Sequence, residues 1–215
     1  IGTKLMGRLE QEPGVRKVVA FDVNPLPLPV HNIAFYRKNV SESIEDELNE
    51  QGANTLVHLA FNAHRGASRR EVAIIHDENV ETLRSVMASC VNARVNHLIY
   101  LSSHSVYGAH SDNPVPIPDD APMRPPSDYP YAYDKQQCEL VLQEFALAQN
   151  DVKITALRSC IVLGHGADNL ATRSLFRPWM LGVMDYNPPM QFVYDDDLAR
   201  VMSIIIQQEI PGTFN

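Results

Sequence analysis

The sequence predicts an α/β fold in which helices cover both faces of a parallel sheet. Short runs rich in β-branched and aromatic residues alternate with helical patterns along the 215 residues. Such alternation is typical of βαβ units, whose right-handed crossovers build a doubly wound sheet. Hydrophobic residues make up 45% of the chain, which is enough for a core beneath two helix layers. We therefore expect a doubly wound parallel sheet with one small additional region.

Hydrophobic spacing and turn residues define the elements of the first half of the chain. Ile1, Leu5 and Leu9 recur at helical spacing, so a helix is already under way at the first residue. The run RKVVAFDV, residues 16–23, predicts the first strand. The other elements predicted here are a helix over 41–52 with a serine cap and a glycine stop, a strand over 54–61, one or two helices over 70–95, and a strand over 96–103.

In the second half, residues 108–130 contain eight prolines or glycines and predict a loop. Asp197 is expected to cap the last helix rather than to react. The predicted elements are a helix over 131–149, a strand and its exit over 152–164, a helical stretch over 169–181, a short strand over 191–193 and a helix over 195–208. No strand precedes the opening helix, and the last residues indicate a turn entering a strand. We therefore expect the numbering to cover part of a longer chain.

Charge and residue spacing exclude several classes of function. The net charge is −8, and no run of Lys or Arg offers the basic surface that nucleic-acid binding requires. Cys90, Cys138 and Cys160 are scattered, so no disulfide framework is predicted, and neither CxxC nor HExxH spacing offers a metal site. No apolar run reaches the length of a membrane span, and no signal peptide opens the chain. We expect a cytoplasmic protein without metal, nucleic-acid or membrane partners.

Ligands of doubly wound sheets bind at the carboxyl ends of the strands, so the residues that follow each strand are the candidates. Asp22 follows the first predicted strand, where a carboxylate accepts hydrogen bonds from the adenosine ribose and repels a 2′-phosphate. That position favours NAD over NADP. The competing interpretation is a turn aspartate before Asn-Pro. Gly2 stands where the last glycine of a dinucleotide-binding turn would lie, although one glycine is no evidence by itself.

A second candidate group follows the predicted strand 96–103. Ser102 and Ser103 lie at its exit, and Tyr131 and Lys135 share one face of the helix that comes after the loop. A phenol is a poor base at neutral pH because its pKa is near 10. A neighbouring ammonium favours the phenolate and lowers that pKa, which suits alcohol–ketone chemistry.

Taken together, these residues resemble the extended short-chain dehydrogenase/reductases, the NAD-dependent epimerase/dehydratase group. The resemblance covers nearly the whole chain, and its order and spacing are more specific than any one motif. The matching features are Asp22 after a strand, HLAF at 58–61, Asn79, LSSHSVYG at 101–108, the proline loop ending in Ser127, Tyr131 with Lys135, LRSCIVLG at 157–164, QFVYDDDLA at 191–199 and GTFN at 212–215.

The resemblance implies a role for each matching residue. Tyr131 would be the general acid/base, Lys135 would lower its pKa and bind the nicotinamide ribose, and Ser103 would hydrogen-bond the reacting oxygen. The cofactor contacts that it implies are Gly2, Asp22, Asn39, Leu59, Ala60, Ser102, Tyr131, Lys135, Cys160 and Ile161. It also implies a Rossmann fold over residues 1–163, part of a small substrate-binding region over 164–190, and a return to the Rossmann domain over 191–215.

Two departures from the family pattern narrow the expected reaction. His104 and Ser105 stand where dehydratases of the family carry an Asp-Glu pair, so elimination of water is not expected. Ile161 replaces an asparagine that contacts the substrate in nucleotide-sugar enzymes, which weakens that substrate class without excluding it.

The sequence thus predicts an NAD-dependent oxidoreductase or epimerase that acts on a secondary alcohol or ketone, with a sugar nucleotide as one candidate substrate. The alternative is a regulatory protein that senses a dinucleotide on the same fold without turnover. We also expect a homodimer, because extended family members pair the helices corresponding to 70–95 and 131–149 across a two-fold axis.

Overall fold

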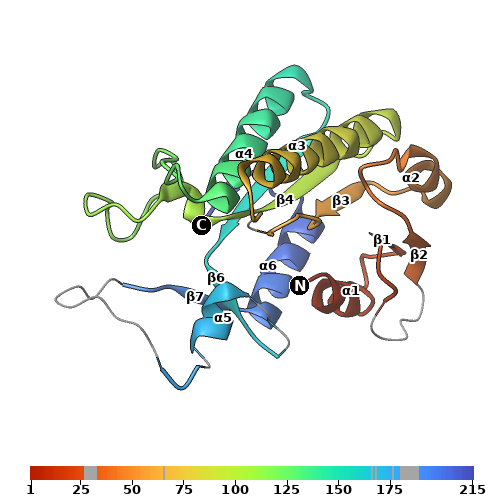
Figure 1. Ribbon diagram of the computed structural model, residues 1–215. Coiled ribbons are helices and arrows are strands. Elements are labelled where there is room, and N and C mark those ends of the chain that lie inside the picture. Colours follow the sequence, from red (N-terminus) through yellow and green to blue (C-terminus); the bar gives the residue numbers. More distant parts are fainter. Residues whose placement is uncertain (27–32, 65, 166, 168, 176, 180–188) are drawn as a thin grey trace.

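A computed structural model of the protein describes residues 1–26, 33–64, 66–165, 167, 169–175, 177–179 and 189–215. Strands and helices alternate along the chain (Figure 1), which confirms the predicted α/β class. In chain order the elements are α1 (Gly2–Leu9), β1 (Val18–Asp22), β2 (Ile33–Arg37), α2 (Glu45–Gln51), β3 (Thr55–His58), α3 (Arg69–Asn92), β4 (His97–Ser103), the 3₁₀ turn η1 (His104–Tyr107), α4 (Pro130–Ala148), β5 (Lys153–Ser159), β6 (Ile161–Leu163), α5 (Leu170–Leu175), β7 (Phe192–Tyr194), α6 (Asp195–Gln208) and β8 (Gly212–Phe214).

The described strands pair in parallel throughout. β3, β4, β5 and β8 form a four-stranded sheet in that order, while β1 pairs with β2 and β6 pairs with β7. The pairing of β4 with β5 runs from His97 opposite Lys153 to Ser103 opposite Ser159. Because these strands point the same way, their carboxyl ends meet at one edge, where Ser103 lies.

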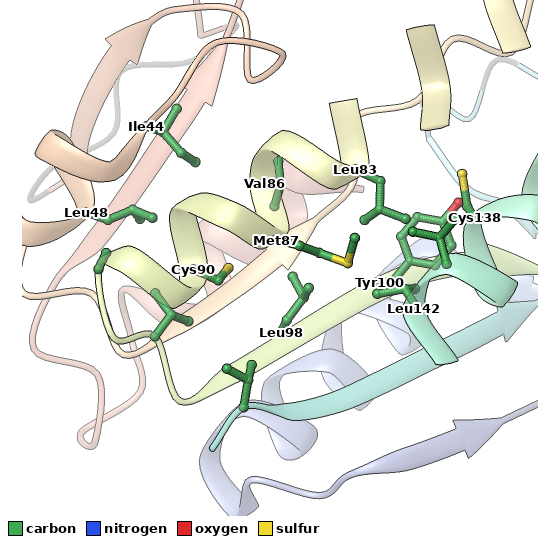
Figure 2. Packing of buried hydrophobic residues seen from close by; sticks show 14 residues of the cluster. Ile44, Leu48, Leu83, Val86, Met87, Cys90, Leu98, Tyr100, Cys138 and Leu142 are labelled. Carbon is green, nitrogen blue, oxygen red and sulfur yellow. The ribbon is translucent and has the colours of Figure 1, made fainter. Parts of the chain in front are cut away.

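Helices cover both faces of the four-stranded sheet. α3 and α4 lie side by side on one face, and α1 packs against α6 on the other (Figure 1). β4 shows the reason, because alternate side chains of a strand point to opposite faces. Leu98 and Tyr100 enter the core beneath α3 and α4, whereas Ile99 enters the core beneath α1 and α6. Figure 2 shows the first of these cores, with Met87 of α3 close to Leu98. The doubly wound arrangement is therefore confirmed.

A cavity of about 1300 Å³ is lined by residues of both β1 and β3. Within the described residues, β1 pairs only with β2 and β3 pairs only with β4, so the two strand edges that face the cavity carry no ladder hydrogen bonds. Apolar side chains such as Leu5 and Leu56 line its interior. Asp22, Leu59 and Ala60 line it at the carboxyl ends of the two strands.

Several element predictions need correction. β2 was not predicted, because Ile33–Arg37 is short and follows a proline-rich stretch. Of the one or two helices predicted over 70–95, the structure has one, α3, so that prediction is confirmed in its simpler form. Ile44 occupies the capping position of α2. The predicted serine contact comes from Ser43, one residue before that position, whose hydroxyl oxygen accepts from the Glu45 amide at 3.4 Å.

The last helix also begins differently from the prediction. Asp197 does not cap α6, since the helix starts at Asp195 with Tyr194 at the capping position. Much of the predicted substrate-binding region over 164–190 falls outside the described residues. The domain boundaries at 163 and 190 therefore stay predictions.

Candidate active site

Ser103 ends β4 and begins the 3₁₀ turn η1. Its side chain is buried, and its hydroxyl oxygen accepts hydrogen bonds from the Ser105 amide at 3.2 Å and from the Ser105 hydroxyl at 2.9 Å. The η1 turn therefore fixes the Ser103 hydroxyl at the carboxyl edge of the sheet, as expected for a side chain that contacts a ligand there.

Tyr131 lies in the first turn of α4, directly after Pro130. Proline suits this position because its fixed φ matches a helix and its missing N–H would have no helical partner. Burial raises the pKa of the Tyr131 phenol, a hydrogen bond with Ser103 lowers it, and the charge of Tyr129 raises it, so that the net pKa is raised. Tyr131 and Ser103 are thus brought together, as the family resemblance implies. The predicted lowering of the phenol pKa is not present here, because burial outweighs the hydrogen bond.

Lys135 lies one helical turn after Tyr131 and is only 5% exposed. Its ammonium nitrogen donates to the Leu101 carbonyl at 2.8 Å and sits 3.7 Å from the centre of the Phe61 ring and 4.7 Å from that of Tyr100. Burial lowers the pKa of this amine to about 7, although neighbouring acidic groups on α4 raise it. Lys135 therefore changes charge near neutral pH.

A buried ion pair fixes α4 against the sheet. Arg158 of β5 donates to Glu139 of α4 at 2.7 Å, and both side chains are almost fully buried. Glu139 also accepts from the Ser102 hydroxyl, and Arg158 donates to the Tyr107 hydroxyl. Because the Ser102 hydroxyl is used in this way, a contact from Ser102 to a cofactor would come from its main chain.

This ion pair was not predicted, since its partners lie 19 positions apart in the sequence. The available signal was the place of Glu139 four residues after Lys135. That spacing puts an acidic side chain on the inward face of the helix.

A second polar cluster joins α4 to α3 and to the segment after β3. Asp134 accepts from Asn79 at 3.1 Å and pairs with the His76 ring at 2.7 Å. The Asn79 side chain also accepts from the Asn62 amide at 2.8 Å and donates to the Asn62 carbonyl at 3.1 Å. One amide group thereby holds both main-chain groups of Asn62. Asn79 had appeared only as a family motif, and His76 and Asp134 gave no signal in the sequence.

The residues predicted to hold the adenosine end of a cofactor lie near β1 and β2. Asp22 is exposed at the end of β1, and its carboxylate accepts from the Asn24 amide at 2.8 Å, so the turn interpretation also applies. Arg37 lies opposite Asp22 in the register and donates to the Val23 carbonyl. Asn39 is exposed, and its side-chain oxygen accepts from the Ser41 amide. Asn39 is not among the residues that line the large cavity.

Gly2, Leu59 and Ala60 lie together where α1 meets the end of β3. A Cβ on Gly2 would lie 3.6 Å from the Leu59 side chain, an ordinary contact, so space alone does not require glycine. Cys160 and Ile161 form a separate group at the junction of β5 and β6, one residue beyond Ser159, which pairs with Ser103. Of the predicted cofactor residues, Asp22, Leu59 with Ala60, and Cys160 thus lie at the carboxyl ends of β1, β3 and β5, whereas Asn39 lies beyond β2.

Groups that would support other kinds of site are missing from the described part. Among the residues that the structure describes, no cluster of three or more His, Cys, Asp or Glu side chains could hold a metal ion. The helices in that same part are all too short or too polar to cross a membrane.

A parallel sheet wound on both faces, with polar groups at its carboxyl edge, defines the Rossmann class of proteins. Within that class, the chain belongs to the NAD dependent epimerase/dehydratase family, whose family model matches residues 1–215.

Several known proteins are similar to this chain. UDP-glucose 4-epimerase of Thermus thermophilus, solved with NAD, is 19% identical, with a TM-score of 0.81 over 100% of this chain and 73% of that one. MoeE5, solved with UDP-glucuronic acid and NAD, is 25% identical, with a TM-score of 0.77 over 99% of this chain and 71% of that one. An uncharacterized protein of Mycobacterium bovis is 23% identical across the whole chain, which spans 58% of that relative's length.

Proposed function

We propose that the protein is an NAD-dependent epimerase or dehydrogenase that oxidises a secondary hydroxyl group of a sugar nucleotide. The observation that carries this proposal is the convergence of Ser103, Tyr131 and Lys135 at the carboxyl edge of β4. The substrate class rests on the solved relatives, of which one was solved with UDP-glucuronic acid. The departure at Ile161 argues only against a side-chain hydrogen bond from that one position.

In this mechanism Tyr131 would take the proton of the substrate hydroxyl as the carbon that bears this hydroxyl loses a hydride and becomes the carbon of a ketone. NAD, when bound, supplies the acceptor for that hydride. Ser103 donates a hydrogen bond to the reacting oxygen and holds it beside the phenol. Protonated Lys135 would favour the phenolate form of Tyr131 and would donate to the ribose hydroxyls of a bound cofactor. An epimerase would return the hydride to the other face of the ketone, whereas a dehydrogenase would release the ketone.

The residues present fit a dinucleotide that runs along the carboxyl edge of the sheet. The exposed Asp22 carboxylate would accept from the adenosine ribose, and Gly2, Leu59 and Ala60 would lie along the chain of the cofactor. Lys135 would lie at the nicotinamide end, because its ammonium has one described carbonyl acceptor and further N–H groups to donate. Residues 164–190, which lie between β6 and β7 in the sequence, would contribute to the substrate region.

Two alternative functions are less well supported. Dehydration needs an acid and a base beside the sugar, and the positions after Ser103 hold His104 and Ser105 instead of two carboxyl groups. A dinucleotide sensor has no use for Tyr131 and Lys135 as a pair. The chain keeps both, and Ser103 is hydrogen-bonded with Tyr131.

We further propose that two copies pair through α3 and α4. These adjacent helices carry exposed apolar side chains, among them Ile74, Val91, Leu140 and Leu147. An isologous contact would bury the same surface on both copies. Sedimentation of the purified protein at micromolar concentration tests this pairing, and a monomer there would contradict it.

The decisive experiment compares Tyr131→Phe with Tyr133→Phe in the purified protein. We expect Tyr131→Phe to lower turnover of a UDP-sugar by roughly a hundredfold or more, the usual scale for a positioned acid/base group. Its affinity for NAD should change little, because Lys135 is retained. Tyr133 is the matched control, since it lies on the same helix with 44% of its surface exposed.

The assay follows interconversion of UDP-sugars and formation of NADH. An active Tyr131→Phe protein would refute the assignment. Tight NAD binding without turnover of UDP-sugars or simple secondary alcohols would favour the sensor.

A further inference from the structure

Phe61 has no assigned role, yet it contacts both Tyr131 and Lys135. The Lys135 ammonium nitrogen lies 3.7 Å from the centre of the Phe61 ring, which is direct contact with its face. The edge of the same ring system meets Tyr131, with ring centres 5.5 Å apart and an interplanar angle of 83°. Edge-to-face pairs of this kind are favourable, so the two rings orient each other.

The main chain around Phe61 is fixed relative to α4. Phe61 lies between the end of β3 and the start of α3, directly before Asn62. Asn79 binds both the amide and the carbonyl group of Asn62, and its amide nitrogen also donates to Asp134, the residue before Lys135. The position of the Phe61 ring is therefore set by hydrogen bonds that connect its own segment to the helix carrying Lys135.

Lys135 has little else around it that could neutralise or hydrate its charge. Its side chain forms no ion pair within the part of the chain that the structure describes. The titratable groups that face it or its neighbours are His58 of β3, Tyr100 of β4, Tyr131, Asp134, Cys138 and Glu139 of α4, and His76 of α3, which pairs with Asp134. Glu139 is already paired with Arg158 and Asp134 with His76.

We propose that Phe61 is a positioning residue for this site, whose ring excludes water from the Lys135 amine and orients the Tyr131 ring. The proposal rests on the proposed function for its link to turnover, but the contact itself stands on geometry alone. Two effects of the ring oppose each other. Exclusion of water favours the neutral amine, and the negative face of the ring favours the ammonium. Burial is the main influence on the Lys135 amine and lowers its pKa to about 7, so water admitted at the ring should raise that pKa.

The test is an NMR titration of the lysine side-chain nitrogens in cofactor-free protein. The chain has five lysines, and Lys135→Met identifies the Lys135 signal. Phe61→Ala admits water, so the Lys135 midpoint should rise by at least about one pH unit toward the ordinary value near 10.4. Phe61→Leu still excludes water but lacks the aromatic face, so its midpoint should lie about half a unit below that of the unmodified protein.

Phe145→Leu is the matched control, because Phe145 is another partly buried phenylalanine packed against the same core. Its substitution should leave the Lys135 midpoint unchanged. An unchanged midpoint in both Phe61 variants, or an equal shift in Phe145→Leu, would overturn the proposal. Since the titration needs neither NAD nor substrate, absence of turnover would count against the proposed function and leave this inference standing.

Discussion

Replacing Lys135 by methionine should remove one specific component of the pH dependence of folding. The Lys135 amine has a pKa of about 7 in the folded protein, against about 10.4 for an ordinary lysine in the unfolded chain. Between these values the unfolded chain binds more protons, so the free energy of unfolding rises with pH. Integrated from pH 7 to pH 8.5, the gain is about 1.5 kcal/mol. Well below pH 7 the amine is protonated in both the folded and the unfolded protein, so burial of the ammonium lowers the free energy of unfolding by its full amount.

The assay is urea denaturation at several pH values between 7 and 8.5. For each protein the free energy of unfolding is plotted against pH. The quantity of interest is the slope for the unmodified protein minus the slope for Lys135→Met. This subtraction cancels groups common to both proteins, such as the Cys90 thiol, whose pKa is raised by burial to about 12 and which opposes stability as pH rises. The variant also leaves the Leu101 carbonyl without its lysine donor at every pH. The slope against pH therefore isolates the titration of the amine, whereas the free energy of unfolding at one pH does not.

The control is Lys153→Met, which removes a half-exposed lysine paired with Glu209. That variant should keep the pH slope of the unmodified protein. Equal slopes in Lys135→Met and the unmodified protein would show that the amine is hydrated in solution. Lys135 would then not be buried in solution, and both its low pKa and the proposed role of Phe61 depend on that burial.

Three further predictions concern other parts of the molecule. Glu139→Gln should lower the free energy of unfolding by about 3–5 kcal/mol in chemical denaturation, because it leaves the buried Arg158 guanidinium without a counter-charge. An unchanged free energy of unfolding would contradict this. Gly108→Ala should cost at least about 1 kcal/mol, since Gly108 has φ of 68° and a Cβ there would lie 2.4 Å from the Arg124 carbonyl oxygen; an unchanged melting temperature would show that the turn relaxes. Asp22→Asn should narrow the preference for NAD over NADP in titrations of both cofactors, because the carboxylate repels a 2′-phosphate; equal binding of both cofactors to the unmodified protein would show that Arg37 outweighs Asp22.

Local signals predicted most of the fold. The strand around Val18–Asp22 and the long helix before β4 follow from spacing and residue type, and Gly52 ends α2 in a left-handed conformation as expected. β2 escaped prediction because five residues give too little alternation, and its pairing with β1 depends on residues 15 positions away in the chain. The start of α6 was misplaced because three consecutive aspartates, Asp195 to Asp197, offer equivalent capping side chains.

The candidate site was predictable only where a motif carries it. Ser103, Tyr131 and Lys135 were proposed through the family resemblance, and the hydrogen bond of Tyr131 with Ser103 agrees with that grouping. The Phe61 contact with Lys135 joins residues 74 positions apart, and no local pattern signals it. The direction of the Tyr131 pKa was also beyond the sequence, because burial and the hydrogen bond with Ser103 act in opposite senses and only the folded structure gives their balance.

The hydrogen bonds of Asn79 bear on how the segment after β3 opens locally. The Asn79 side chain accepts from the Asn62 amide, donates to the Asn62 carbonyl and donates to Asp134 of α4. A fluctuation that exposes the Asn62 amide to solvent must therefore break a contact that also ties α3 to α4. The Asn62 amide proton should accordingly exchange as slowly as those of the helix pair, although Asn62 lies in an exposed segment.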